Sequence, residues 1–158
     1  MRLSHQAPSK DRPLPGRASA RAWEQLQPAR CSTGMPLKTR RWCVPAEPDD
    51  GLRVLICRFR PRGLPKEKET WDVWMRELGP SPPLLAAFQG KGQTPITLDE
   101  YRERYLREME AQHEKIAELA ARVDQGETVT LLCSKDCIIA EACHRTLLAE
   151  LIEAARAK

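Results

Sequence analysis

Two short apolar runs, separated by helix-like sequence, constrain the fold of this chain most. The run "LRVLICRF" at 52–59 contains four consecutive apolar residues, and "TVTLLC" at 128–133 ends in three more. Uninterrupted apolar runs of this length are typical of strands that are buried on both faces. Strands that alternate with helical segments favour parallel pairing. The sequence therefore predicts an α/β fold with a small, mainly parallel sheet flanked by helices.

The remaining elements follow from apolar spacing and from capping residues. A further short strand is predicted at 40–44. A helix is predicted over 67–78, because Trp71, Trp74, Met75 and Leu78 recur at spacings of three and four. A short helix is predicted from Pro82 through "LLAAF".

One long helix is predicted from Thr97 to about Val123. Thr97 and Glu100 form a capping box at its start. The positions expected on its buried face are Tyr101, Tyr105, Met109, Ile116, Leu119 and Val123. A last helix is expected from about Ala140 to Ala157, which places Cys143 in its first turn.

The charge of the chain is unevenly divided along its length. Residues 1–34 contain six basic and two acidic residues, whereas the remaining 124 contain twenty of each. We interpret residues 1–34 as a disordered tail, and as the result of a translation start assigned too far upstream. Residues 35–158 are then a single α/β domain. A neutral domain disfavours strong binding of duplex nucleic acid but leaves room for a local basic patch.

Apolar length and cysteine usage bear on localisation. No apolar stretch approaches the roughly 20 residues needed to span a bilayer, so no membrane association is expected. Six cysteines without a secretory signal indicate free thiols in a reducing compartment. The sequence therefore predicts a soluble cytoplasmic protein.

Residues that carry chemistry follow both buried strands. Ligands of open parallel sheets bind beyond the carboxyl ends of the strands. Arg58, Arg60 and Arg62 alternate after the first strand, and "CSKDCIIAEACHR" follows the second. Three guanidinium groups on one side of an extended segment favour recognition of a phosphate or carboxylate. The alternative is structural ion pairing with acidic residues such as Glu103 or Glu108.

The cysteines and the histidine allow several interpretations. Cys143 near a helix start can be a reactive thiol, and His144 can be its acid or base, whereas Cys133 and Cys143 can equally be buried packing residues. Arg145 and the first N–H groups of the last helix can extend an anion pocket. Zinc is disfavoured, because no C-x2-C pair is present and adjacent helical residues point about 100° apart. No metal and no cofactor are therefore expected.

Several motifs, taken in order, resemble the domain-of-unknown-function family 488, the YeaO-like proteins. They are "RVLICRFRPRGLPKE", Trp71, "GPS" at 79–81, "YRERYLREM" at 101–109, and "TVTLLC" followed by "CHRTLL". The resemblance covers about residue 35 to the C-terminus and implies a small α/β domain, mostly of bacteria, without an established reaction. The family usually has Trp at position 60 and often Asp at position 57, where this chain has Arg60 and Cys57. The positions that match the family pattern are Arg58, Pro61, Arg62, Gly63, Trp71, Pro80, Ser81, Tyr105, Cys133, Cys143, His144 and Arg145.

The leading hypothesis is a pocket for a small anionic, phosphate-bearing ligand. The expected ligand-binding residues are Arg58, Arg62, Gly63, Arg145, Trp71, Ser81 and Tyr105. A catalytic version makes Cys143 or Cys133 the nucleophile and His144 its acid or base. The alternative is a non-enzymatic module that binds nucleic acid or protein.

Overall fold

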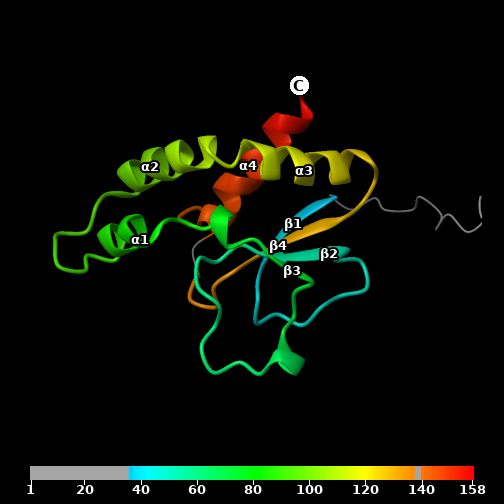
Figure 1. The fold of residues 1–158 in the computed structure, drawn as a ribbon, viewed down its shortest axis with the longest axis horizontal. Coiled ribbons are helices and arrows are strands. Elements are labelled where there is room, and N and C mark those ends of the chain that lie inside the picture. The colour runs from blue at the N-terminus through cyan, green and yellow to red at the C-terminus, as the bar shows by residue number, and fades with distance from the viewer. Residues whose placement is uncertain (1–35, 138–139) are drawn as a thin grey trace, which may run out of the picture. The chain divides into compact units, whose positions relative to one another are not determined.

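The computed structural model of the protein describes residues 36–137 and 140–158. Within them, a sheet of four parallel strands has the order β1-β4-β2-β3 (Figure 1). The strands are β1 (Leu37–Arg41), β2 (Leu52–Leu55), β3 (Val73–Trp74) and β4 (Val129–Cys133). The prediction of a small parallel α/β sheet is confirmed. The tail 1–34 lies outside the described residues.

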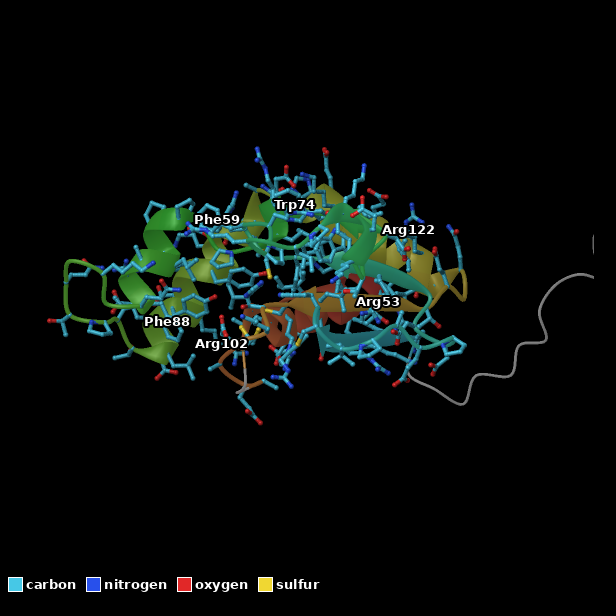
Figure 2. The ribbon with its side chains drawn as sticks, turned by 90° about the horizontal axis from the view of Figure 1, so that it is seen from below. Arg53, Phe59, Trp74, Phe88, Arg102 and Arg122 are labelled. Atoms are coloured by element: carbon cyan, nitrogen blue, oxygen red, sulfur yellow. The ribbon has the colours of Figure 1, made fainter. Side chains whose placement is uncertain are left out.

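One face of the sheet is covered by helices. Helices α3 (His113–Asp124) and α4 (His144–Arg156) pack on the strands, α2 (Leu98–Glu110) packs on α4, and α1 (Pro82–Phe88) packs on α2. Figure 1 shows α2, α3 and α4 on the same side of the strands, and in Figure 2, seen from below, the strands lie in front of the helices. Val54, Val129 and Leu131 point to this side and join Leu119 and Leu148 in the apolar core. Among the helices of the described residues, none is long and apolar enough to cross a membrane.

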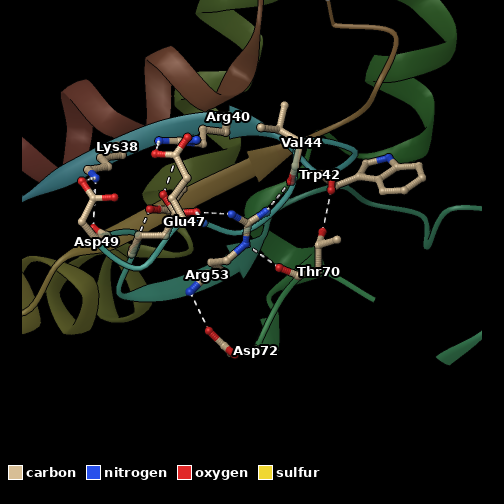
Figure 3. A network of polar contacts seen from close by, with 11 residues as sticks. Lys38, Arg40, Trp42, Val44, Glu47, Asp49, Arg53, Thr70 and Asp72 are labelled. Atoms are coloured by element: carbon tan, nitrogen blue, oxygen red, sulfur yellow. Dashed lines mark hydrogen bonds and ion pairs between the residues drawn. The ribbon is translucent and has the colours of Figure 1, made fainter. Parts of the chain in front are cut away.

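The opposite face of the sheet is covered by loops and carries a buried polar network (Figure 3). Arg53 is only 3% exposed and forms an ion pair with Asp50, which is 1% exposed. The guanidinium of Arg53 also donates to the carbonyl oxygen of Val44 at 3.0 Å. Arg40 donates to Glu47 at 2.7 Å. The buried positive charge of Arg53 is thus neutralised by the buried carboxylate of Asp50. Without this partner, the buried charge would strongly destabilise the fold.

The predicted helix over 67–78 is wrong. The segment contains two short 3-10 turns, η2 (Lys66–Lys68) and η3 (Arg76–Leu78), on either side of strand β3. The backbone N–H of Met75 donates to the carbonyl oxygen of Leu55 at 2.9 Å, so the sheet takes a donor that a helix would need. Trp74 is 38% exposed instead of lying in the core.

The predicted long helix is interrupted. The helices α2 and α3 are separated at Ala111 and Gln112, where Gln112 has φ −108° and ψ 15°. The buried face expected for the long helix is otherwise correct. Thr97 Oγ1 accepts from the N–H of Glu100 at 3.2 Å, which is one half of the capping box, whereas the Glu100 carboxylate pairs with Arg104. The break falls about one turn after Met109. A continuous amphipathic helix would have an apolar residue there, but the sequence has Gln112, so no apolar side chain at this position packs the turn against the core.

Strand and helix ends differ from the prediction elsewhere. Strand β1 is shifted by three residues toward the N-terminus relative to the predicted range 40–44. Helix α4 begins at His144 instead of about Ala140. Cys143 is therefore the N-cap of α4, with φ −99° and ψ 136°, and is not helical.

Candidate functional site

A cavity of about 560 Å³ lies at the carboxyl ends of β2 and β4. Its wall is formed by the segments that follow these strands, 57–64 and 133–137, together with the start of α4. Trp42, Phe88 and Tyr101 contribute aromatic surface. This is the edge of a parallel sheet at which ligands are expected to bind.

Three cysteine sulfurs meet in the wall of this cavity. Cys133 ends β4, Cys137 lies in the following turn, and Cys143 caps α4. The Sγ of Cys133 donates to the Sγ of Cys137 at 3.2 Å, and the Sγ of Cys143 donates to that of Cys133 at 3.1 Å. Cys133 and Cys143 are buried, whereas Cys137 is partly exposed.

His144 lies beside this cluster at the first position of α4. Its Nε2 lies 3.0 Å from the carbonyl oxygen of Ile56, which fixes the proton on Nε2 because a carbonyl can only accept. Its Nδ1 is left as an acceptor, and the Sγ of Cys133 lies 3.8 Å from Nδ1 and 3.9 Å from Nε2. Burial lowers the pKa of His144, so the ring is neutral at pH 7.

The thiols influence one another's ionisation. Hydrogen bonds from Cys133 and Cys143 lower the pKa of Cys137. Hydrogen bonding to Cys137, followed by the contacts with Cys143 and Cys57 and by burial, raises the pKa of Cys133. The thiol of Cys133 lowers the pKa of Cys143, but Cys137 and burial outweigh this effect and raise it. Burial and raised pKa values do not favour Cys133 or Cys143 as a nucleophile.

The arginines after β2 separate into different roles. The guanidinium of Arg58 donates from Nε to the carbonyl oxygen of Pro80 and from Nη2 to that of Gly79, both at 3.1 Å, and Arg58 lines the cavity. Arg62 is exposed and also lines it. Arg60 instead donates to Glu69 at 2.8 Å and to the carbonyl oxygen of Leu64. Structural pairing therefore applies to Arg60, with Glu69 as the partner in place of Glu103 or Glu108.

Arg145 is buried behind the cavity wall. It is 8% exposed and is not one of the lining residues. Its Nε has no hydrogen-bond partner among the described residues. Its positive charge contributes to lowering the pKa of Cys137, after the two thiol hydrogen bonds, which places it near the sulfur cluster.

The other expected site residues have different positions. Gly63 lines the cavity and has φ 71°, which favours glycine. Tyr105 donates to the carbonyl oxygen of Leu78 at 2.8 Å, and Ser81 caps α1 and contacts Glu108. Trp71 packs edge-on against Trp42. Tyr105, Ser81 and Trp71 are not among the residues that line the cavity.

Sequence reasoning missed several residues of the cavity wall. These are Trp42, Cys57, Phe88 and Lys135. Cys57 and Lys135 lie in segments that the strand-end rule had already selected, so that rule applied to every polar residue there would have found them. Trp42 and Phe88 carry no such signal, because only the tertiary fold brings them to this edge.

The fold and the cavity define a small parallel α/β domain with a thiol-rich pocket at the carboxyl edge of its sheet. The family model described as "Active DUF488-N3 subclade" matches residues 37–156, and the chain belongs to this DUF488 family. It is 38% identical over 100 residues to "Uncharacterized protein YeaO" of Escherichia coli K12, covering 63% of this chain and 84% of that one. It is 29% identical over 106 residues to "Uncharacterized protein Rv3073c" of Mycobacterium tuberculosis H37Rv, covering 67% and 84%. No solved structure matches the chain.

Proposed function

We propose that the cavity binds a small ligand with a phosphate or carboxylate group. The observation that carries this proposal is the charge of the wall. Arg58, Arg62 and Lys135 line the cavity, and Asp136 is the one carboxylate among the described lining residues. Because the domain as a whole is neutral, this local excess is a property of the cavity and not of the general surface.

The position of Arg58 supports recognition of an anion. Two backbone carbonyl oxygens hold its guanidinium, so little side-chain entropy is lost when a ligand binds. Gly79 permits this arrangement. A Cβ at Gly79 would lie 2.6 Å from the backbone nitrogen of Arg58 and 2.8 Å from the carbonyl oxygen of Ile56. The close approach of these two segments therefore requires glycine at position 79.

The rest of the wall suits a ligand with an apolar or aromatic body. Trp42, Phe88, Leu85 and Tyr101 line the cavity opposite or beside the charged groups. A volume of about 560 Å³ is within the range of about 300 to 1,000 Å³ that is usual for small-molecule sites. A nucleotide or a phosphorylated metabolite combines the two features.

Calorimetric titration of the full chain with inorganic phosphate, nucleoside monophosphates and sugar phosphates tests the proposal. Arg62→Ala is the main variant, because Arg62 is exposed and its loss should not disturb folding. We expect about 10- to 100-fold weaker binding, corresponding to one charge-assisted contact. Arg76→Ala is the control, because Arg76 is 63% exposed and does not line the cavity. Absence of binding by every probe, or an equal loss in the Arg76 variant, would contradict the proposal.

The alternative, an interaction module for nucleic acid, receives less support. Basic side chains on the exposed face of α2 and α3 are paired with acidic ones one turn away, as in Arg104 with Glu100 and Arg107 with Glu103. Such pairs leave no net positive stripe for a phosphate backbone. Salt-dependent binding of a DNA duplex by the full chain would support this alternative instead.

A further inference from the structure

We propose that Cys133, Cys137 and Cys143 bind a thiophilic divalent cation such as Zn²⁺, with the adjacent imidazole of His144 as the fourth ligand once its ring turns toward the ion. This site goes beyond the anion pocket and does not depend on it. The three sulfurs lie within 4.8 Å of one another. They approach one another from the end of a strand, a turn and a helix cap, with three and then five residues between them.

The spacing of the three sulfurs is close to that of a tetrahedral zinc site. With Zn–S bonds of about 2.3 Å and Zn–N bonds of about 2.0 Å, two sulfurs lie about 3.8 Å apart and a sulfur and a nitrogen about 3.5 Å apart. The observed separations are 3.2 Å for Cys133 and Cys137, 3.1 Å for Cys143 and Cys133, and 3.8 Å from Cys133 Sγ to His144 Nδ1. Outward shifts of the sulfurs by about half an ångström, with a rotation of the His144 ring that directs Nδ1 at the ion, would complete the site.

The backbone holds the ligand-bearing residues in place. The carbonyl oxygen of Cys133 accepts from the N–H of Trp42 at 2.8 Å, which continues the pairing of β4 with β1. The N–H of Cys137 donates to the carbonyl oxygen of Ser134, and that of Cys143 to Ala140. A site whose ligands are already positioned costs less conformational entropy when it binds its ion.

His144 has the environment of a metal-binding imidazole. Histidines that bind a metal through one ring nitrogen usually donate the other N–H to a carbonyl or carboxylate group. Here Nε2 donates to Ile56, and Nδ1 is left as a free acceptor beside Cys133, whose sulfur lies 3.8 Å from Nδ1 and 3.9 Å from Nε2, so the ring must turn for Nδ1 to bind the ion. On sequence grounds, the direction of the side chains disfavours zinc only if Cys143 and His144 are both helical, because adjacent helical residues point about 100° apart. This assumption is wrong, because Cys143 has extended backbone angles and only His144 lies in the helix.

The charge near the cluster also fits a metal. Three thiolates and a divalent ion carry a net charge of −1, since each thiol loses its proton on binding. Arg145 is buried nearby and forms no ion pair with any described residue, so its charge would balance that of the cluster. The second group of possible ligands, Glu47, Asp49 and Asp50, is already paired with Arg40, Lys38 and Arg53. That group therefore carries no comparable argument.

Metal analysis and Co²⁺ substitution of the reduced full-length protein test the site. We expect about one equivalent of Zn²⁺ per chain, and a Co²⁺ form with intense tetrahedral ligand-field bands and thiolate-to-metal charge transfer. Cys137→Ser is the main variant, because Cys137 is partly exposed in a turn and its replacement should not prevent folding. It should lower Zn²⁺ affinity more than about 100-fold, which exceeds the usual loss for an outer-shell residue. Cys43→Ser, at an exposed cysteine that does not line the cavity, should bind as the unmodified protein does.

Two further variants decide the fourth ligand. His144→Asn should keep the charge-transfer bands but change the ligand-field bands and weaken binding. Cys57→Ser should retain binding, although the thiol of Cys57 contacts Cys133. If Cys57→Ser loses the metal and His144→Asn keeps its spectrum, the assignment of His144 is refuted.

Failure of the metal site would be distinct from failure of the anion pocket. A reduced, folded protein that takes up neither Zn²⁺ nor Co²⁺ would overturn the metal site, as would formation of a disulfide among these cysteines without any uptake. Phosphate or nucleotide binding that is weakened by Arg62→Ala would still be measurable in that protein. Conversely, metal uptake without binding of any anionic probe would refute only the anion pocket.

Discussion

Replacing Tyr105 by Phe separates a structural role of this residue from a role in ligand binding. The hydroxyl of Tyr105 donates to the carbonyl oxygen of Leu78 at 2.8 Å, and both residues are fully buried. Phe preserves the ring and leaves the carbonyl group without this donor. Loss of a partner by a buried polar group costs about 1 to 3 kcal/mol. In a folded region of this size we expect the melting temperature to fall by about 3 to 10 °C, with unchanged affinity for Zn²⁺ and for anionic probes.

Tyr101→Phe is the matched control for this experiment. Tyr101 is 3% exposed, lies one turn before Tyr105 in α2, and has no hydrogen bond from its hydroxyl among the described residues. We expect its melting temperature to change little. Thermal unfolding of both variants followed by circular dichroism, and calorimetric titration of Tyr105→Phe, provide the comparison; Tyr101 lines the cavity, so its variant is a control for stability only. An unchanged melting temperature of Tyr105→Phe together with lost ligand binding would refute the structural interpretation.

Two further predictions concern the polar face and the thiols. Asp50→Asn should lower the free energy of unfolding by about 3 to 5 kcal/mol in urea titrations, because the buried Arg53 loses its counter-charge. Burial alone would raise the pKa of Asp50, but the N–H of Glu47 and the guanidinium groups of Arg53 and Arg40 outweigh it and lower this pKa. The contribution of Asp50 is thus complete above the unfolded pKa of about 3.9 and is lost as the pH falls through the folded value, so the variant should show a shallower acid dependence. Peptide mass spectrometry after iodoacetamide treatment of metal-free protein should find Cys43 and Cys137 modified before Cys133 and Cys143, and Zn²⁺ should protect Cys137; earliest modification of Cys143 would contradict this order.

The parts of the fold that were predicted correctly depend on local patterns. Strand β4, the start of α1 at Pro82 and the cap of α2 at Thr97 follow from residues within one turn or one strand. The segment 67–78 was predicted wrongly because its tryptophan spacing suits a helix, whereas pairing with β2 decides its structure. That pairing joins residues about twenty positions apart and has no local signature. The same limit applies to Arg53, whose burial depends on the loop that carries Asp50.

The candidate site could likewise be predicted from local patterns only in part. The strand-end rule selected the two segments that form the cavity wall, but it did not assign roles to individual side chains. Arg60 illustrates this, because alternation groups it with Arg58 and Arg62 while Glu69 and the carbonyl of Leu64 hold it away from the cavity wall. The departure from the family pattern at position 60 therefore leaves the charge of the cavity unchanged. Ligand preference depends on the residues that line the wall.

The turn 134–137 belongs to both proposed sites and should couple them. Lys135 and Asp136 line the cavity, while Cys137 is a member of the sulfur cluster. Fixing Cys137 on a metal ion would order this turn, and a ligand that then contacts Lys135 would lose less conformational entropy on binding. Reciprocity requires the anionic ligand to raise the affinity for the metal by the same factor. Arg58 and Arg62 lie on the separate segment that follows β2, so removal of the metal should weaken anion binding without abolishing it.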